Sequence, residues 1–453
     1  MKAKHKIIVI DDDPTGTQTV KNVPVWTVWD RESLESAFLD EYPLFFILSN
    51  TRALTETKAR KLTSEICTNI KTAAEKTGSS FSIISRSDST LRGHFPAEPE
   101  AIEEGLGHPF DAWLIIPFFA EGGRITENDI HYLQQGSIRI PVSETSFAKD
   151  PVFGFRNSKL KDWIEEKTGA TIRAQEVLSI SVRELEESSD QVLLNKVMTY
   201  ANRRVVIVNA TNISQLRKLA GVIVQASSAG KNFLYRTASS WVKVLLEQAT
   251  DQIEEDVLIS NYILFKGGNN IRHRNDSGGL IVVGSYVPET TAQLNYLLKA
   301  SARIETMEIK VADIPVNSTN IGFAGYFAKK IDALLVANKT VVIYTSRENI
   351  SGDTPEENLN ISCRISAAIS EIVGQLGVKP AWLIAKGGIT SSDIATRSLG
   401  IKKAIVVGSL LSGIPVWQTG PESKFPGMLY IVFPGNVGTE EALYLAVEKL
   451  SME

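Results

Sequence analysis

The sequence has few of the residues that build metal sites and disulfide frameworks. Among its 453 residues are two cysteines, Cys67 and Cys363, and five histidines. The cysteines lie far apart and form no CxxC pair, and the histidines show no ligand spacing. A zinc enzyme and a disulfide-rich secreted domain are therefore disfavoured. This cysteine usage predicts a protein of the reducing cytoplasm.

Sequence motifs that mark common enzyme classes are also missing. There is no G-x-x-x-x-G-K-[ST] P-loop, no G-x-G-x-x-G dinucleotide fingerprint and no G-x-S-x-G nucleophile elbow. No apolar run approaches the roughly 18 residues of a membrane-spanning helix, and the run after the basic first residues is too short for a signal peptide. The net charge of −4 does not indicate binding to nucleic acid or to a membrane surface. Small molecules remain as the expected partners, and the sequence leaves open whether the chain is a monomer or a homo-oligomer.

The chain does contain a regular alternation of short apolar runs with helical patterns. Hydrophobic residues make up 43% of it. The runs are continuous in valine and isoleucine rather than alternating with polar residues, which is typical of strands buried on both faces of a parallel sheet. The predicted strands are Lys6–Ile10, Leu44–Ser49, Phe81–Ser85, Trp113–Pro117, Arg204–Asn209, Phe233–Arg236, Leu280–Gly284, Thr340–Thr345, Trp382–Ala385, Ala404–Gly408 and Leu429–Phe433.

One polar, glycine-rich stretch, KGGNNIRHRNDSGG at residues 266–279, interrupts this alternation. We interpret it as a linker between an N-terminal domain, residues 1–265, and a C-terminal domain, residues 280–453. A surface loop inside one domain would give the same pattern. The predicted fold is α/β, with two domains that each hold a mostly parallel sheet flanked by helices. Because ligands bind beyond the carboxyl ends of parallel strands, we expect the active site in the interdomain cleft.

In the first half, acidic, basic and hydroxyl residues follow the predicted strands. Asp11, Asp12 and Asp13 end the first strand, and since adjacent carboxylates repel one another, a cation or a substrate hydroxyl explains them better than a capped turn does. Arginine binds carboxylates bidentately, and hydroxyl and carboxylate groups suit sugar hydroxyls. We therefore expect a pocket for a small polyhydroxylated anion. The other candidates for this pocket are Thr15, Asn50, Arg52, Arg86, Asp88, Ser89, Arg92, Glu121 and Arg124.

In the second half, glycines and hydroxyl residues follow the predicted strands instead. Main-chain amides at the start of a helix, with glycines that let a ligand approach, form a phosphate cradle, although plain strand-to-helix turns have a similar composition. A sugar-acid pocket in one half and a phosphate cradle in the other favour a kinase. The stretches concerned are Gly284-Ser285, residues 386–392, Gly408-Ser409 and residues 434–438.

Several segments resemble motifs of the four-carbon acid sugar kinase family, formerly a domain of unknown function. The resemblance covers nearly the whole chain, and SDSTLRG is its most specific block. Ile389 stands where the family usually has an acid. The segments are DDPTG (12–16), SDSTLRG (87–93), PFFAEGGRITENDIHYLQ (117–134), SETSFAKDP (143–151), YRTASSWV (235–242), KGGITSSDIA (386–395) and PGNVG (434–438).

The resemblance implies that the N-terminal domain binds the sugar acid and that the C-terminal domain binds ATP with Mg²⁺. The implied reaction is phosphorylation of the terminal hydroxyl of threonate, erythronate or a 3-oxo-tetronate. The residues assigned to the sugar acid by resemblance are Asp12, Arg86, Asp88, Ser89 and Arg92. Those assigned to the nucleotide are Ser285, Gly387, Gly388, Thr390 and Gly435, and we add Ile389 and Asn436 from the same two stretches.

We predict that Asp12, Asp13 and Arg92 are catalytic. Asp12 would orient or deprotonate the terminal hydroxyl, and Arg92, with Arg86 or Arg124, would hold the substrate carboxylate. Such catalysis would depend mainly on positioning and electrostatics.

Two alternatives stay open. Asp11-x-Asp13-x-Thr15 fits the D-x-D-x-T signature of haloacid-dehalogenase-like phosphatases, which would use Asp11 and Asp13. These enzymes also need a strand-borne G-D-x-x-x-D, and the one Gly-Asp pair, Gly352-Asp353, follows a polar loop. The other alternative is a non-catalytic sugar-acid sensor, which would bind its ligand without turning over ATP.

Overall fold

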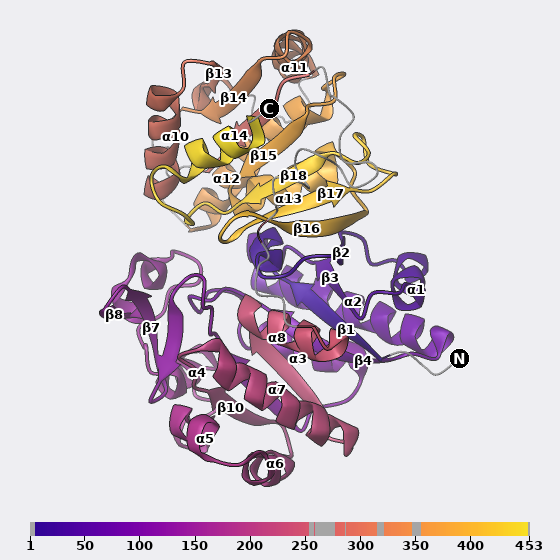
Figure 1. The fold of residues 1–453 in the computed structure, drawn as a ribbon, viewed down its shortest axis with the longest axis vertical. Helices are drawn as coiled ribbons and strands as arrows, with labels where there is room; N and C mark the ends of the chain where they lie inside the picture. Colours follow the sequence, from indigo (N-terminus) through magenta and orange to yellow (C-terminus); the bar gives the residue numbers. More distant parts are fainter. Residues whose placement is uncertain are drawn as a thin grey trace. The chain divides into compact units, whose positions relative to one another are not determined.

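The computed structural model describes residues 5–252, 258, 277–285, 287–314, 321–346 and 355–451. The chain forms two compact units (Figure 1). The first comprises Met1–Thr19 and Val28–Glu255, and the second comprises Val20–Thr27 and Asp256–Glu453. The second unit thus takes one short segment from near the start of the chain. Residues 266–276 of the predicted linker and the Gly352-Asp353 pair lie outside the described residues.

The sheet of the first unit is parallel throughout, in the order β3-β1-β4-β11-β5-β10-β9. Its central strands are buried along nearly their whole length, as their continuous apolar runs predict. All carboxyl ends therefore meet at one edge. The strands are β1 (His5–Asp11), β3 (Leu44–Leu48), β4 (Ser80–Arg86), β5 (Ala112–Ile116), β9 (Leu178–Ile180), β10 (Arg204–Val208) and β11 (Phe233–Thr237).

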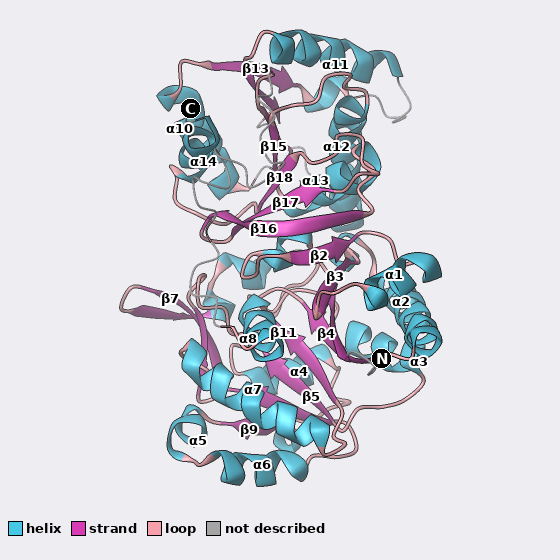
Figure 2. Cartoon of the chain, turned by 45° about the vertical axis from the view of Figure 1, so that its right-hand side comes forward, coloured by secondary structure: helices cyan, strands magenta, loops and turns pink. Residues whose placement is uncertain are grey.

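Helices flank this sheet, with α1, α2 and α3 packed in a row and α7 packed against α8 (Figure 2). Helix α2 illustrates how these helices pack. Ala59, Ile66 and Ile70 form its buried apolar face, and Gly78, at φ +65°, ends it. The helices are α1 (Arg31–Leu39), α2 (Glu56–Thr77), α3 (Ala97–Leu106), α4 (Leu160–Lys167), α5 (Val182–Glu187), α6 (Asp190–Met198), α7 (Ile213–Ser228) and α8 (Ser239–Thr250). Short 3₁₀ helices are η1 (Pro14–Thr17), η2 (Thr51–Ala53), η3 (Val142–Glu144), η4 (Ser146–Lys149) and η5 (Ala174–Glu176).

A small antiparallel sheet is inserted after β5. It consists of β6 (Arg124–Glu127), β7 (Ile130–Gln135) and β8 (Ile138–Pro141). The turn between β6 and β7 places Asn128 and Asp129 at positive φ, as a two-residue hairpin requires. This sheet positions Arg124 at the start of β6.

The sheet of the second unit has the order β13-β14-β12-β15-β18-β17-β16-β2. The first five strands are parallel, and the last three pair in antiparallel fashion. The strands are β2 (Val23–Trp26), β12 (Leu280–Val283), β13 (Ile304–Ile309), β14 (Thr340–Thr345), β15 (Trp382–Lys386), β16 (Lys403–Leu411), β17 (Ile414–Thr419) and β18 (Leu429–Phe433). The predicted α/β fold, with two domains whose mostly parallel sheets are flanked by helices, is confirmed.

Helices α10 and α14 pack against each other in the second unit, as do α11 and α12. One face of the sheet and helices α10 and α14 share an apolar core that includes Ile281, Leu294 and Leu443. The helical elements are α10 (Pro288–Ala300), η6 (Val311–Asp313), α11 (Ile321–Val336), α12 (Pro355–Gly374), α13 (Gly388–Asp393), the π-helical η7 (Ile394–Ser398) and α14 (Ala442–Ser451). No helix in the described ranges is long and apolar enough to cross a membrane.

The expectation that Gly408-Ser409 ends a strand at a ligand site is wrong. Gly408 lies inside β16, next to an irregularity in its antiparallel pairing with β17, and has φ +136°. The pentapeptide IVVGS occurs at residues 281–285 and again at residues 405–409. Its first copy does end a parallel strand, β12. The same five residues therefore serve as a strand end in one place and as a β-bulge in the other.

Candidate functional site

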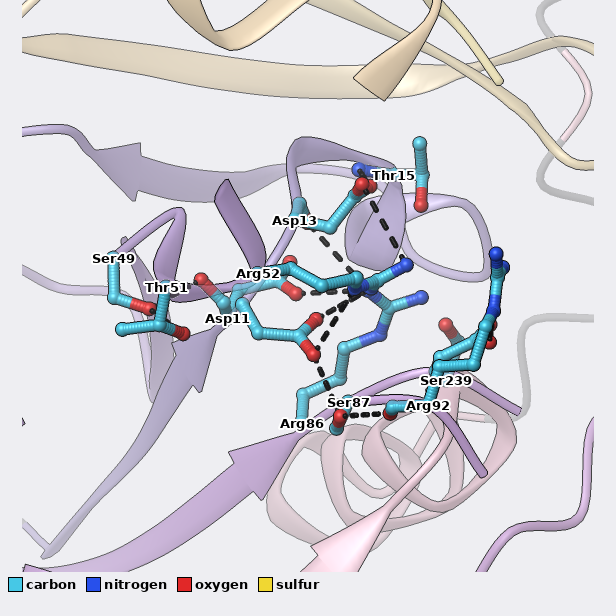
Figure 3. A network of polar contacts seen from close by, with 12 residues as sticks. Asp11, Asp13, Thr15, Ser49, Thr51, Arg52, Arg86, Ser87, Arg92 and Ser239 are labelled. Atoms are coloured by element: carbon cyan, nitrogen blue, oxygen red, sulfur yellow. Dashed lines mark hydrogen bonds and ion pairs between the residues drawn. The ribbon is translucent and has the colours of Figure 1, made fainter. Parts of the chain in front are cut away.

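The three aspartates at the end of β1 each have a different partner (Figure 3). Asp11 Oδ1 accepts a hydrogen bond from Arg86 Nη1 at 3.0 Å. Asp12 Oδ1 is 2.6 Å from Arg52 Nη2. Asp13 caps η1 by accepting from the Thr15 amide at 2.8 Å. Arg52, which follows β3, and Arg86, which ends β4, thus offset part of the repulsion between the adjacent carboxylates.

Asp12 is the most completely bound of the three. Arg52 also donates Nε to its Oδ2 at 3.2 Å, which makes the pair bidentate, and the Ser87 hydroxyl donates to Oδ2 at 2.6 Å. Burial alone would raise the pKa of this carboxyl, but Arg52, Arg86 and the Ser87 hydroxyl bring the pKa of Asp12 below its ordinary value. Asp12 is therefore ionised at neutral pH.

Asp11 has the opposite character. Burial raises the pKa of Asp11 to about 7, against the opposing effect of Arg86. A Cβ on Gly16 would lie 2.0 Å from Asp11 Oδ2, so only glycine at this position lets η1 fold back over the carboxyl group. Asp11 is a buried group with little room for a ligand.

The segment after β4 brings Asp88 and Arg92 together. Arg92 Nε donates to Asp88 Oδ2 at 2.7 Å, and Arg92 Nη1 donates to Asp150 Oδ2 at 3.4 Å. Although burial opposes it, the nearby guanidinium groups hold the pKa of Asp88 far below its usual range. The guanidinium groups of Arg92 and Arg124 both lie over the ring of Phe147, at 5.1 and 5.8 Å from its centroid.

Three further residues of this half were predicted to bind the substrate: Asn50, Ser89 and Glu121. Asn50 precedes η2 in the left-handed conformation, at φ 51°. Ser89 is buried, and its carbonyl accepts from His131 Nε2 at 2.7 Å. Burial lowers the pKa of His131 to about 4, so that the neutral ring holds this loop. Glu121 is exposed in the turn between β5 and β6. Among the described residues, no hydrogen bond or ion pair joins it to the aspartates and arginines of the site.

Sequence reasoning missed two buried charged residues, Arg236 and Glu98. Arg236 comes from β11, which the structure places between β4 and β5. Strand order is not encoded in spacing, so β11 was not recognised as a neighbour of β4. The available signal was a lone arginine at the end of an apolar strand, within YRTASSWV. Glu98 lies on α3 and accepts a hydrogen bond from the Thr51 hydroxyl.

Glu98 predicts a pH dependence of stability. Burial, and the Asp12 carboxylate after it, raise the pKa of Glu98 to about 7, while Arg236 opposes the shift. An acid whose pKa is raised on folding costs nothing below its unfolded pKa, near 4.5, and lowers the free energy of unfolding progressively as the pH rises to 7. Relative to the wild type, the free energy of unfolding of Glu98→Gln should be higher at pH 8 than at pH 5 by about 2.5 kcal/mol.

Urea denaturation of both proteins at the two pH values measures this difference. Glu104→Gln, an exposed position on the same helix, is the matched control and should show equal differences from the wild type at pH 5 and pH 8. Equal differences for Glu98→Gln would contradict the assignment.

In the second unit, three glycine-containing strand ends meet at one edge of the sheet. Strands β12, β15 and β18 are parallel neighbours. They are followed by Ser285, Gly387 and Gly435 respectively. Thr290 links two of these ends, because its hydroxyl donates to the Gly435 carbonyl at 2.8 Å and lies within hydrogen-bond distance of Ser285 Oγ, at 3.2 Å. The structure therefore brings together the strand ends that the sequence analysis assigned to the nucleotide.

The geometry of these glycines fits an anion. A Cβ on Gly387 would lie 3.0 Å from Ser285 Cβ, and one on Gly435 would lie 3.2 Å from Ser285 Oγ. Glycine at these two positions thus lets the ends of β15 and β18 approach Ser285 closely. The chain then runs helically from Gly388 through η7, so the first amides, of Gly388, Ile389 and Thr390, have no partner within the helix. Asn436 is half-buried in the turn after β18.

Lys386, the last residue of β15, binds the turn that follows β18. Its side chain is fully buried, and Nζ donates to the Pro434 carbonyl at 2.5 Å and to the Gly435 carbonyl at 3.3 Å. It also lies 4.1 Å from the ring centroid of Phe433. Burial lowers the pKa of Lys386 well below its ordinary value. Lys386 therefore fixes the turn after β18 against the end of β15.

Comparison with known protein families agrees with this division of the chain. Residues 7–245 match the family described as a sugar-binding N-terminal domain, and residues 280–443 match the nucleotide-binding C-terminal domain. The chain belongs to the four-carbon acid sugar kinase family. The predicted family is confirmed, with sugar binding in the first matched region and nucleotide binding in the second. A comparison of the sequence with curated proteins found no significant match.

Two solved structures share the fold of this member of the sugar kinase family. One is a protein of Salmonella typhimurium LT2 provisionally named a tRNA synthase, with a TM-score of 0.68 and 16% identity over 99% of this chain and 100% of that one. The other is the Haemophilus influenzae protein HI1011, assigned to DUF1537, with a TM-score of 0.61 and 17% identity over 98% of this chain and 100% of that one. At such identities the similarity concerns the fold alone.

Proposed function

We propose that the protein is an ATP-dependent kinase that phosphorylates the terminal hydroxyl of a four-carbon sugar acid: threonate, erythronate or a 3-oxo-tetronate. The observation that carries this proposal is a contrast between the two sheets, at the edge where the carboxyl ends of their parallel strands meet. One gathers guanidinium and carboxylate groups within the sugar-binding family region, and the other gathers main-chain amides and glycines within the nucleotide-binding region. A kinase for an organic acid needs both.

The sugar acid is assigned to the edge of the first unit. The ionised Asp12 orients the terminal hydroxyl, Asp13 lies beside it, and Arg92 adds positive charge to the side of the site that receives the carboxylate. Because its pKa is lowered, Asp12 is a weak base and acts mainly by positioning the hydroxyl. Phosphoryl transfer tolerates this, since its transition state needs alignment and charge stabilisation more than early proton removal. The residues proposed to complete this site are Thr15, Asn50, Arg52, Arg86, Asp88, Ser89, Glu121 and Arg124.

ATP is assigned to the edge of the second unit. The amides of Gly388, Ile389 and Thr390 would bind phosphate oxygens, and Gly435 would let the chain of phosphates pass close to the backbone. The remaining nucleotide contacts are proposed for Ser285, Gly387 and Asn436. Within the described ranges, no three His, Cys, Asp or Glu side chains form a metal-binding group. We therefore assign Mg²⁺ to the phosphates of the incoming nucleotide, where it neutralises their charge.

The phosphatase alternative is less compatible with the site. It requires Asp11 as an ionised nucleophile open to a phosphate ester. Asp11 differs from Asp12 in that Gly16 packs against its carboxyl group and burial raises its pKa to about 7, which disfavours an ionised nucleophile. These features favour a structural role for Asp11.

The test is a panel of four-carbon sugar acids, each incubated with ATP and Mg²⁺ and assayed for ADP. The position of the new phosphate is then determined by ³¹P NMR. We expect ADP formation with at least one acid and a phosphate on its terminal carbon. Phosphate release from sugar phosphates without nucleotide would instead support the phosphatase. Binding of a sugar acid without ADP formation would support a sensor, and either result would contradict the proposal.

A further inference from the structure

Arg236 is a buried guanidinium group without an acidic partner. Its side chain is on β11 and the residue is 5% exposed. Nη2 donates to the main-chain carbonyl of Arg92 at 3.2 Å, whereas the buried Nε has no hydrogen-bond partner. Arg236 makes no ion pair with any residue that the structure describes. Because a buried charge is costly unless an opposite charge accompanies it, an anion is missing beside this side chain.

The neighbouring arginines differ from Arg236 in this respect. Arg52, Arg86 and Arg92 each have a carboxylate at 3.0 Å or less. The acid with the largest electrostatic effect on Arg236 is Glu98, whose own hydrogen bond comes from Thr51. Three arginines thus have a carboxylate in direct contact, and among the described residues Arg236 has none.

Arg236 reaches the polar surface on which Asp12 lies. Gly93 has φ +116°, and a Cβ there would meet Ser87 Oγ at 2.4 Å, Asp12 Oδ2 at 3.1 Å and Arg236 Nη2 at 3.2 Å. The carboxylate, the hydroxyl and the guanidinium group therefore converge around one glycine. A larger residue at position 93 would separate them.

Arg124 is a second guanidinium group of the same kind. Its Nε is buried without a hydrogen-bond partner, and Nη1 donates to the carbonyl of Gly122. No ion pair joins it to an acid among the described residues. Arg124 lies at the start of β6, in the small sheet inserted after β5. The Asp88 carboxylate acts electrostatically on both Arg124 and Arg236, so two arginines without an ion pair lie near the same acid.

We propose that Arg236, together with Arg124, binds the carboxylate of the substrate and so selects sugar acids over neutral polyols. This inference rests on the proposed function in that the anion is taken to be the carboxylate of the sugar acid. A guanidinium group offers two parallel N–H donors to a carboxylate, which a hydroxymethyl group cannot accept in the same way. The residues already paired with Asp11 and Asp12 then serve to shape the site.

The test compares each sugar acid with the polyol of the same configuration, erythronate with erythritol and threonate with threitol. In Arg236→Met we expect kcat/KM for the acid to fall about 100-fold or more and that for the polyol to change less than threefold. A merely structural arginine would lower both equally. Arg236→Lys should recover only part of the preference, because lysine keeps the charge and loses the two-pronged geometry. Arg183→Met, an exposed position on α5, is the control and should leave the acid-to-polyol ratio unchanged.

A second measurement separates this inference from the proposed function. The melting temperature of the wild type and of Arg236→Met is recorded with and without sodium erythronate, threonate, tartrate and malate. We expect stabilisation of the wild type by at least one of these anions and its loss in the variant. ADP formation with an unchanged acid-to-polyol ratio in Arg236→Met would overturn the inference and leave the kinase intact. No turnover, but stabilisation that depends on Arg236, would overturn the kinase and leave the anion site. Anions that stabilise neither protein, or both equally, would overturn the inference.

Discussion

Replacing Asp12 by asparagine is expected to lower kcat/KM for the sugar acid by about 100-fold or more. The carboxylate is ionised, accepts from Arg52 at both oxygens and from Ser87 at one, and is 1% exposed. Asparagine can keep one acceptor but removes the closer of the two carboxylates that pair with Arg52, leaving Asp13 at 3.7 Å, and this is expected to cost about 3 kcal/mol of stability as well. Steady-state kinetics and urea denaturation of the same preparation measure the two effects.

Asp12→Glu distinguishes a catalytic loss from a folding defect. It keeps the charge and the ion pair with Arg52 but moves the carboxylate by one methylene, and misplacement on that scale is expected to cost about 100-fold in turnover. Asp190→Asn, at an exposed position on α6, is the control for handling and should retain wild-type kinetics. Near-normal turnover in both Asp12 variants would remove Asp12 from the mechanism.

Replacing Gly387 by alanine is expected to raise the KM for ATP by about tenfold or more, with little effect on the KM for the sugar acid. Gly387 has φ +115°, which a residue with a Cβ rarely adopts, and its Cβ would lie 3.0 Å from that of Ser285. Strain of this kind costs on the order of 1–3 kcal/mol, and about 1.4 kcal/mol corresponds to a factor of ten in affinity. Initial rates over a matrix of both substrates give the two KM values.

Two further glycine variants separate strain from obstruction. Gly435→Ala brings no left-handed strain but places a methyl group 3.2 Å from Ser285 Oγ, so it should also raise the KM for ATP. Gly400→Ala, at φ +59° with nothing within 4 Å, carries left-handed strain without obstruction and should leave it unchanged. An effect of Gly400→Ala as large as that of Gly387→Ala would indicate general destabilisation of the unit.

The α/β fold could be predicted because its strands are buried on both faces. A continuous apolar run such as residues 6–10 has few other places in a folded chain, and every strand predicted this way is present. Of the antiparallel strands of the second unit, β16 was predicted as a strand, whereas β2 and β17, which contain proline, were not. Their pairing depends on partners far away in the sequence, which local patterns do not record.

The residue types of the candidate site could be predicted, but their pairing could not. Charged residues that follow buried parallel strands must gather at one edge of the sheet, and this rule is enough to group Asp12, Arg52 and Arg92. Which arginine neutralises which acid depends on strand order and register. Without the position of β11, Arg236 had no place in the site, and the pairing of Arg86 with Asp11 could not be foreseen.

Strand β2 pairs with a strand that is synthesised much later than β2 itself. Residues 23–26 pair in antiparallel fashion with β16, which is made about 380 residues later. At the usual speed of translation this interval lasts on the order of tens of seconds. Until then β2 lacks its partner in the sheet of the second unit, and a shortened gene that begins at residue 256 would produce a β16 without β2 along one hydrogen-bonding edge, open to self-association.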